Sequence, residues 1–185
     1  MQTTQELDVV DLLRIQHAGI RKLIEEVRRA DGDRKREAFE ELVRLLMVHE
    51  SAEEEVVHPI ARRQVGEAVV DARLLEEADL KTLIADLHDH GLDDGRFGRQ
   101  FNVLETAFRD HAEREEQAEF PALRRTLDPA SLWRMARAVR TAEAVAPTHP
   151  QADVHALGNV VAEPPTALFD RVRNRFERWR QSRRK

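Results

Sequence analysis

HESAEEEVVHP at residues 49–59 and HAEREEQAEFP at residues 111–121 are two copies of one pattern, and this repeat decides the fold. In each copy a glutamate follows the histidine by four residues, and a proline follows it by ten. Because an α-helix turns by about 100° per residue, positions i and i+4 lie on one face of a helix, one turn apart. An imidazole and a carboxylate placed in this way reach one metal ion or two neighbouring ions. Two copies on two helices therefore predict a pair of metal sites inside a helical bundle.

The composition excludes several other classes of site. The chain of 185 residues has no Cys, which excludes disulfides, zinc–thiolate sites, iron–sulfur clusters and thiol catalysis, and no Tyr, which excludes a phenolate ligand. A charged fraction of 35% with only seven Gly favours helices over strands. The first residues lack the pattern of a signal peptide, and no segment has the roughly 20 apolar residues that cross a bilayer. We therefore expect a cytoplasmic protein.

Charge is unevenly distributed along the chain. Residues 164–185 carry eight basic and two acidic side chains, which leaves 22 basic and 33 acidic side chains in the preceding residues. An acidic body binds a phosphate backbone poorly and is a suitable host for cations. Nucleic acid is therefore not an expected partner.

Apolar residues at intervals of three and four predict helices over residues 8–30, 34–63, 68–90 and 97–125. Asp8 is expected to cap the first helix, and GLDDG at 91–95 is expected to form the turn after the third.

Both HxxxE pairs lie on the predicted buried faces, which Val56 and Ile60 continue in the second helix and Ala118 and Ala122 continue in the fourth. A buried carboxylate costs several kcal/mol unless it is paired or bound to metal, which is the main physical reason to expect a site here.

The first and third helices each supply one more candidate ligand. His17 lies in the middle of an apolar helix face, 32 residues before His49, and Glu77 lies 34 residues before His111. The similar spacing makes Glu77 the counterpart of His17. Glu76 is the alternative, because helix phase is uncertain by one residue. His88 is only 23 residues before His111, too close for the same level of an antiparallel pair.

This set of residues resembles the hemerythrin-like proteins, the HHE cation-binding domains. The resemblance covers about residues 8–126 and implies an all-α, antiparallel four-helix bundle. The flanking phrases are similar to those of the bacterial, actinobacterial branch. The resemblance implies that Glu53 and Glu115 bridge two metal ions, with the remaining ligands on either side. The implied ligands are His17, His49, Glu53, Glu77, His111 and Glu115.

The resemblance also implies the metal and the class of chemistry. It implies two iron ions joined by an oxo or hydroxo bridge, although Mn or Zn would suit the same donors. Three His with three Glu differ from the histidine-rich oxygen carriers, and carboxylates stabilise ferric over ferrous iron, so reversible O2 carriage is not expected. We expect redox chemistry on O2, peroxide or nitric oxide with an unknown reductant, including catalase-like, peroxidase-like or nitric oxide-reducing activity. The alternative is a non-catalytic sensor of iron or O2, or an iron-binding module.

Other polar residues near the repeat have alternative interpretations. Lys81, one turn after Glu77, could pair with that carboxylate and leave five protein ligands. His58 precedes a proline and is expected to end the helix near the surface, with a gating role or a third metal position as the alternative. Four further glutamates are expected to face solvent or to support the ligands: Glu50, Glu54, Glu113 and Glu116.

The sequence divides into a bundle at residues 1–127 and a C-terminal extension at residues 128–185. The extension is expected to begin with a short helix whose packing face is Leu132, Met135, Ala136 and Val139. Residues 146–165 contain four prolines and predict an irregular strap, and residues 166–185 predict a basic amphipathic helix. That helix is expected to dock on the acidic bundle or on a second copy in a homodimer. Binding of this helix to anionic lipid at a membrane surface or to nucleic acid is the alternative.

Overall fold

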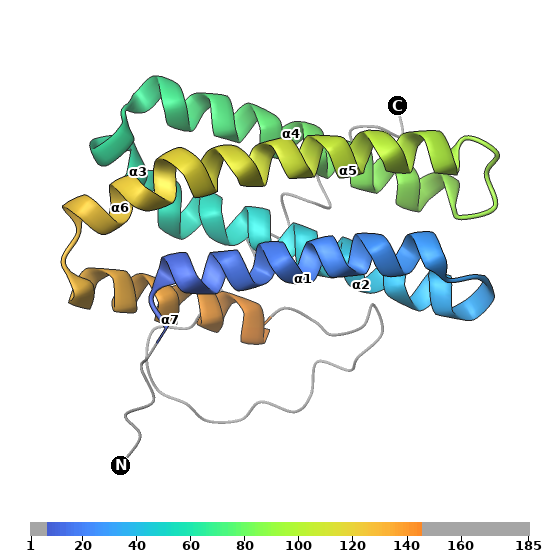
Figure 1. Cartoon of the computed structure of the whole chain (residues 1–185), viewed down its shortest axis with the longest axis horizontal. Helices are drawn as coiled ribbons and strands as arrows, with labels where there is room; N and C mark the ends of the chain where they lie inside the picture. The colour runs from blue at the N-terminus through green and yellow to red at the C-terminus, as the bar shows by residue number, and fades with distance from the viewer. Residues whose placement is uncertain (1–6, 146–185) are drawn as a thin grey trace, which may run out of the picture.

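The computed structural model describes residues 7–145, which form two antiparallel helical hairpins packed against each other (Figure 1). The first hairpin is α1 (Val9–Arg29) with α2 (Gly32–Ala52), and the second is α4 (Glu67–His90) with α5 (Phe97–Arg114). The predicted antiparallel four-helix bundle is confirmed.

Helices α2 and α5 both continue through a short π-helical segment. After α2 come η1 (Glu53–Val57) and α3 (His58–Val65), and after α5 come η2 (Glu115–Glu119) and α6 (Phe120–Thr126). The backbone N–H of His58 donates to the carbonyl of Glu53, and that of Phe120 donates to the carbonyl of Glu115, so each bond spans five residues.

The two prolines of the repeat explain these wide turns. A proline has no N–H to donate, and its ring would clash with the carbonyl four residues earlier in a regular α-helix. Pro59 and Pro121 each follow directly after the residue that closes the π-turn. Widening the turn by one residue relieves the clash and lets the helix continue.

The π-turns also shift the buried face by one residue. Val56 is only half-buried and Ala118 is exposed, whereas Val57 and Glu119 are buried. The predicted faces were therefore wrong at Ala118, which is exposed, and only partly right at Val56 and Ile60, which are half-buried, because they assumed a constant α-helical period. Ala122 is buried, as predicted.

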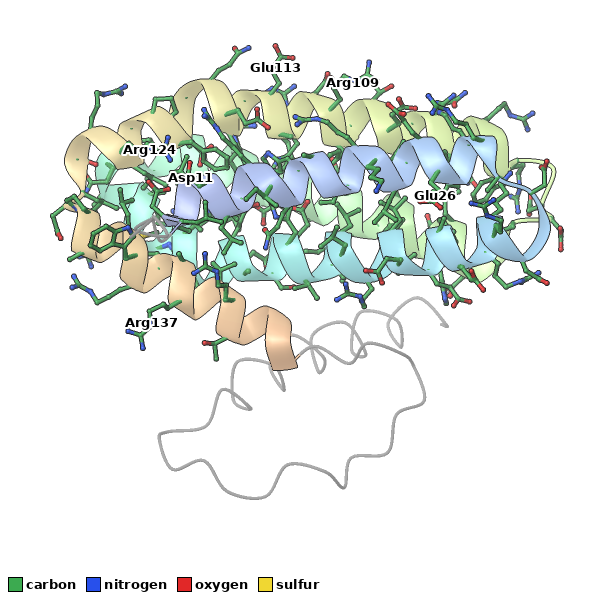
Figure 2. The ribbon with its side chains drawn as sticks, turned by 60° about the horizontal axis from the view of Figure 1, so that its bottom comes forward. Asp11, Glu26, Arg109, Glu113, Arg124 and Arg137 are labelled. Atoms are coloured by element: carbon green, nitrogen blue, oxygen red, sulfur yellow. The ribbon has the colours of Figure 1, made fainter. Side chains whose placement is uncertain are left out.

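Polar contacts hold the start of α1 and the end of α6 together. The Asp8 carboxylate accepts a hydrogen bond of 2.9 Å from the Asp11 N–H, as expected for a helix cap. The guanidinium of Arg124 contacts both Asp8 and Asp11 (Figure 2). Other charged side chains on the same view, such as Arg109 and Glu113, point away from the bundle.

The apolar core consists of two clusters. One lies toward the hairpin turns and includes Phe39, Phe101 and Phe108, and the other includes Leu13, Phe120 and Leu123. A layer of buried His and Glu residues from all four long helices separates them.

The last described helix, α7 (Pro129–Val145), packs against α1, α2 and η1. Its predicted packing residues Leu132, Met135, Ala136 and Val139 are all buried, as expected. The predicted strap and basic helix lie outside the described residues. Among the described helices, none is long and apolar enough to cross a membrane.

Candidate metal centre

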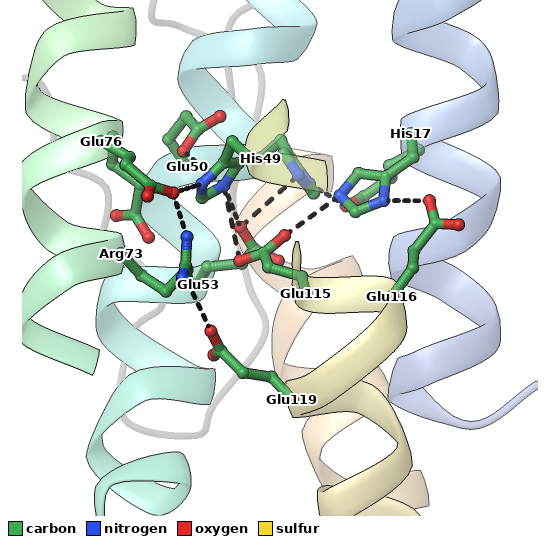
Figure 3. Close-up of polar contacts among 12 residues, drawn as sticks. His17, His49, Glu50, Glu53, Arg73, Glu76, Glu115, Glu116 and Glu119 are labelled. Carbon is green, nitrogen blue, oxygen red and sulfur yellow. Dashed lines mark hydrogen bonds and ion pairs between the residues drawn. The ribbon is translucent and has the colours of Figure 1, made fainter. Parts of the chain in front are cut away.

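The structure brings all six predicted ligands together in the polar layer, and each is at most 1% exposed. The donor atoms form two groups, in each of which they lie within 4.8 Å of one another. The first group is His17, His49, Glu53 and Glu115, and the second is Glu50, Glu53, Glu77 and His111. Figure 3 shows five of these side chains converging between the helices: His17, His49, Glu50, Glu53 and Glu115.

Two carboxylates lie between the groups. Glu115 places Oε2 at 3.3 Å from His17 Nε2 and Oε1 at 3.4 Å from His111 Nε2. The Glu53 Oε2 atom lies 3.5 Å from His49 Nε2 and 4.0 Å from His111 Nε2. Two donors that are each roughly 2.1 Å from one ion are about 3.0 to 3.4 Å apart at octahedral or tetrahedral angles. The three shorter spacings, from 3.3 to 3.5 Å, are close to this range and suit ions placed between the donors, whereas the 4.0 Å between Glu53 Oε2 and His111 Nε2 is longer.

Each histidine is held from its outer nitrogen. The Nδ1 atom of His49 lies 2.8 Å from Gln16 Oε1, that of His17 lies 2.8 Å from Glu116 Oε1, and that of His111 lies 3.2 Å from Glu76 Oε2. All three acceptors are side-chain oxygens, so each Nδ1 carries the proton and donates it. The three Nε2 atoms are thereby directed into the centre, which is the arrangement of metal-bound histidines.

The inward atoms lack hydrogen-bond partners within the described part of the chain. Nine such atoms belong to the two groups: Nε2 of His17, His49 and His111, both oxygens of Glu50 and Glu53, Glu77 Oε2 and Glu115 Oε2. At about 1 kcal/mol each, the low end for a buried unsatisfied polar group, they would cost roughly 9 kcal/mol. Because that approaches the whole stability of a typical domain, about 5–15 kcal/mol, the donor set fits a bound cation rather than an empty core.

The same burial perturbs the ionisation of the metal-free centre. Burial raises the pKa of Glu77 to about 10, with a further contribution from the charge of Glu53. Burial also raises the pKa of Glu50 well above its ordinary value. For His111 burial lowers the pKa, but the charges of Glu115 and Glu50 outweigh it and raise the pKa to about 12. Without metal the centre therefore retains several protons.

Glu50 is a member of the second group that the sequence analysis missed. It was expected to face solvent or to support a ligand, but it is fully buried, and its Oε2 lies 3.6 Å from His111 Nε2. An HxxxE pattern does not reveal the position next to the histidine, because that residue lies 100° around the helix. Helix α2 packs against α4 as well as α1, so more than one of its faces is covered.

The other polar candidates divide between the centre and its surroundings. Glu77 lies inside the second group, whereas Glu76 is partly exposed and bonds His111 from outside. Lys81 pairs with Glu54 at 2.6 Å, so the pairing considered between Lys81 and Glu77 is not formed. His88 is largely exposed, as expected for a residue outside the site.

His58 was expected near the surface, and this prediction was wrong. Its side chain is 2% exposed, and its Nε2 contacts Glu77 Oε1. The π-turn at η1 turns it inward.

A second polar bridge lies one helical turn beyond the ligands. The guanidinium of Arg73 contacts Glu76 and places Nε 2.8 Å from Glu119 Oε1. Burial raises the pKa of Glu119 to about 7. Arg73 thus fixes the carboxylate that holds His111 (Figure 3).

A family model, Hemerythrin HHE cation binding domain, matches residues 8–123 of the chain. The chain belongs to this family. The four bundle helices and the two buried His and Glu groups all lie within the matched residues, so the chain contains a cation-binding HHE domain.

One curated relative of this HHE protein is a DNA nickase from Nostoc sp. (strain PCC 7120), with 27% identity over 124 residues. The aligned part is 66% of this chain and 35% of the relative, so the chain spans about a third of that protein's length. No solved structure matches the chain.

Proposed function

We propose that this HHE domain binds two iron ions and carries out redox chemistry on O2, peroxide or nitric oxide. The observation that carries the proposal is the orientation of three buried histidines, whose Nδ1 atoms are held from outside while their Nε2 atoms face carboxylates without a hydrogen bond. A bound iron pair would supply one-electron redox steps and open coordination positions for a small ligand.

The chain's own residues would then set charge and access. With Glu50 included, four carboxylates stand beside three histidines, so two divalent ions and the four carboxylates balance in charge. Such a set favours the higher oxidation state of the metal, which argues against reversible O2 carriage. The rings of Phe108 and Phe120 lie 5.8 Å and 5.6 Å from the His17 ring and keep bulk water from that side.

The buried ligands would exchange protons for metal. Glu50, Glu77 and His111 hold protons in the metal-free centre and must release them to bind cations. Gln16, Glu76 and Glu116 keep each imidazole in the tautomer that presents Nε2.

The first experiment measures metal per chain and the near-ultraviolet spectrum after aerobic reconstitution with iron. Two irons with charge-transfer bands of a bridged ferric pair are expected, and His49→Ala should lose them while keeping its helical circular dichroism. Turnover of peroxide or nitric oxide by the loaded protein then separates an enzyme from a sensor or iron-binding module. No tightly held metal, or a single zinc, would refute the proposal.

One observation favours a second candidate function, metal-dependent cleavage of DNA. The Nostoc relative is named a DNA nickase, and a pair of metal ions can stabilise both the attacking and the leaving oxygen of a phosphodiester. The test is conversion of supercoiled plasmid to the nicked form by protein loaded with Fe²⁺ or Mn²⁺. Nicking that is equal in the Glu53→Gln variant would exclude this centre as its source.

A further inference from the structure

The repeat extends beyond the ligands to the residue that closes each π-turn. His58 and Phe120 both stand five residues after a glutamate that lies between the two groups, and both donate their backbone N–H to its carbonyl. Because a π-turn holds one more residue than an α-turn, the fifth residue takes the place above the glutamate that the fourth would otherwise occupy. Both side chains are consequently buried at the level of the centre.

These two residues contact equivalent ligands. The ring of Phe120 stacks on His17, with ring centroids 5.6 Å apart and an interplanar angle of 20°. His58 Nε2 contacts Glu77 Oε1. His17 on α1 and Glu77 on α4 occupy the same place in the two hairpins. In each half of the bundle, the residue that closes the π-turn thus contacts the candidate ligand on the first helix of the other hairpin. One contact is a ring stack and the other is a polar contact.

In each pair, Phe120 with His17 and His58 with Glu77, the first side chain suits the chemistry of the second. A phenyl ring fixes the plane of an imidazole by stacking and leaves its nitrogens free. Against a buried carboxylate, a phenyl ring would remove water and offer no hydrogen bond in return. Once Glu77 is ionised, as a metal ligand must be, an imidazole in that place donates Nε2–H to Oε1 and leaves Oε2, which has no hydrogen-bond partner in the described residues, for a cation.

We propose that His58 is a positioning residue for Glu77. In this half of the bundle a histidine stands where the other half has Phe120, because the ligand it contacts is a glutamate where the other half has His17. His58 holds one carboxylate oxygen so that the other binds the metal ion of the second group. The inference rests on the proposed function only in requiring that the centre bind two metal ions.

The test is a double-mutant cycle on the full chain, read by anaerobic Fe²⁺ titration against a competing chelator. His58→Phe should weaken the second ion by about 10- to 100-fold, as for other residues that orient metal ligands, and leave the first ion unchanged. Glu77→His should weaken the second ion in the native background, because two imidazoles then face each other. In the His58→Phe background the same change should strengthen it at least tenfold, because the double variant reproduces the pair formed by Phe120 and His17.

The sign reversal of Glu77→His distinguishes a matched pair from a general loss of stability. Thermal unfolding of each metal-free variant checks the fold, and Phe120→His is the matched control, expected to weaken the first ion alone. If His58→Phe does not fold, the comparison is repeated with His58→Leu and with His58→Gln, of which only the second keeps a donor and should bind the second ion more tightly.

Unchanged affinity in His58→Phe, or a double variant no tighter than His58→Phe, would overturn the inference while the proposed function stands. A native protein that binds no second ion would overturn both.

Discussion

Replacing Glu53 with leucine should have opposite effects on stability with and without metal. The side chain is fully buried, and neither carboxylate oxygen has a hydrogen-bond partner among the described residues. Burial and the charge of Glu115 both raise its pKa, so the metal-free fold bears the cost of this group. A buried polar group without a hydrogen-bond partner costs about 1–3 kcal/mol, which its replacement by an apolar residue of similar volume recovers. At roughly 3 °C per kcal/mol, the Tm of metal-free Glu53→Leu should rise by about 3 to 9 °C.

Metal should reverse the order of stability. A ligand that binds only the folded state at 1,000 times its Kd contributes about 4 kcal/mol, so each tightly bound ion should raise the Tm of the native protein by roughly 12 °C. The Glu53→Leu variant lacks a carboxylate that both groups share, so metal should raise its Tm only slightly. The native protein should therefore be the more stable one in saturating metal and the less stable one in chelator.

Thermal unfolding followed by circular dichroism, in chelator and in anaerobic Fe²⁺, measures both effects. Glu113→Leu is the control, because Glu113 is exposed and its replacement should change stability by no more than about 0.5 kcal/mol under either condition. A lower Tm of Glu53→Leu in chelator would show that this carboxylate stabilises the metal-free fold. An equal metal-induced rise in both proteins would show that Glu53 is not a ligand.

Three further outcomes are expected. Gln16→Leu removes the acceptor of the His49 Nδ1–H and should weaken metal binding by about 10- to 100-fold in a chelator competition, with the metal-free Tm maintained. Metal affinity should rise with pH, because Glu77, with its pKa of about 10, is protonated without metal; calorimetry in buffers of different ionisation enthalpy should detect the released protons. Asp8→Ala should cost about 1 kcal/mol in urea unfolding at pH 7. Burial raises the pKa of Asp8, but the hydrogen bond from Arg124 outweighs it and lowers the pKa, so this cost should be present above about pH 4 and vanish as the pH falls through the folded pKa.

The bundle and the cluster of candidate ligands at its centre were predictable because their signals are local and repeated. Two HxxxE pairs on apolar faces, with one matching residue on each preceding helix, place His17 and Glu77 at the level of the repeat. The choice of Glu77, with Glu76 as the alternative, followed from its spacing to His111, and Glu77 is the one in the buried group. The packing face of α7 was predictable for the same reason.

Glu50 and Gln16, which surround the predicted residues, could not be predicted from the regular helical spacing of apolar residues. Glu50 lies beside His49 on α2, a helix that contacts both α1 and α4, and it is buried. Gln16, one residue from His17, supports the histidine of another helix. Such contacts depend on the relative rotation of two helices, which no spacing within one helix specifies.

The prediction that His58 lies near the surface was wrong for a local reason that is visible in the sequence, namely Pro59. Five residues of regular α-helix would turn His58 about 140° away from Glu53, toward the surface. Pro59 prevents that regularity, because its ring clashes with the carbonyl four residues earlier, and the chain responds with the π-turn that brings His58 inward. The second copy of the repeat has the same proline, and there the π-turn brings Phe120 inward. The proline of the repeat therefore selects which residue after Glu53 and after Glu115 turns toward the candidate ligands. The residue just before the proline therefore does not mark the end of a helix. It faces a candidate ligand, and its side chain is expected to suit that ligand.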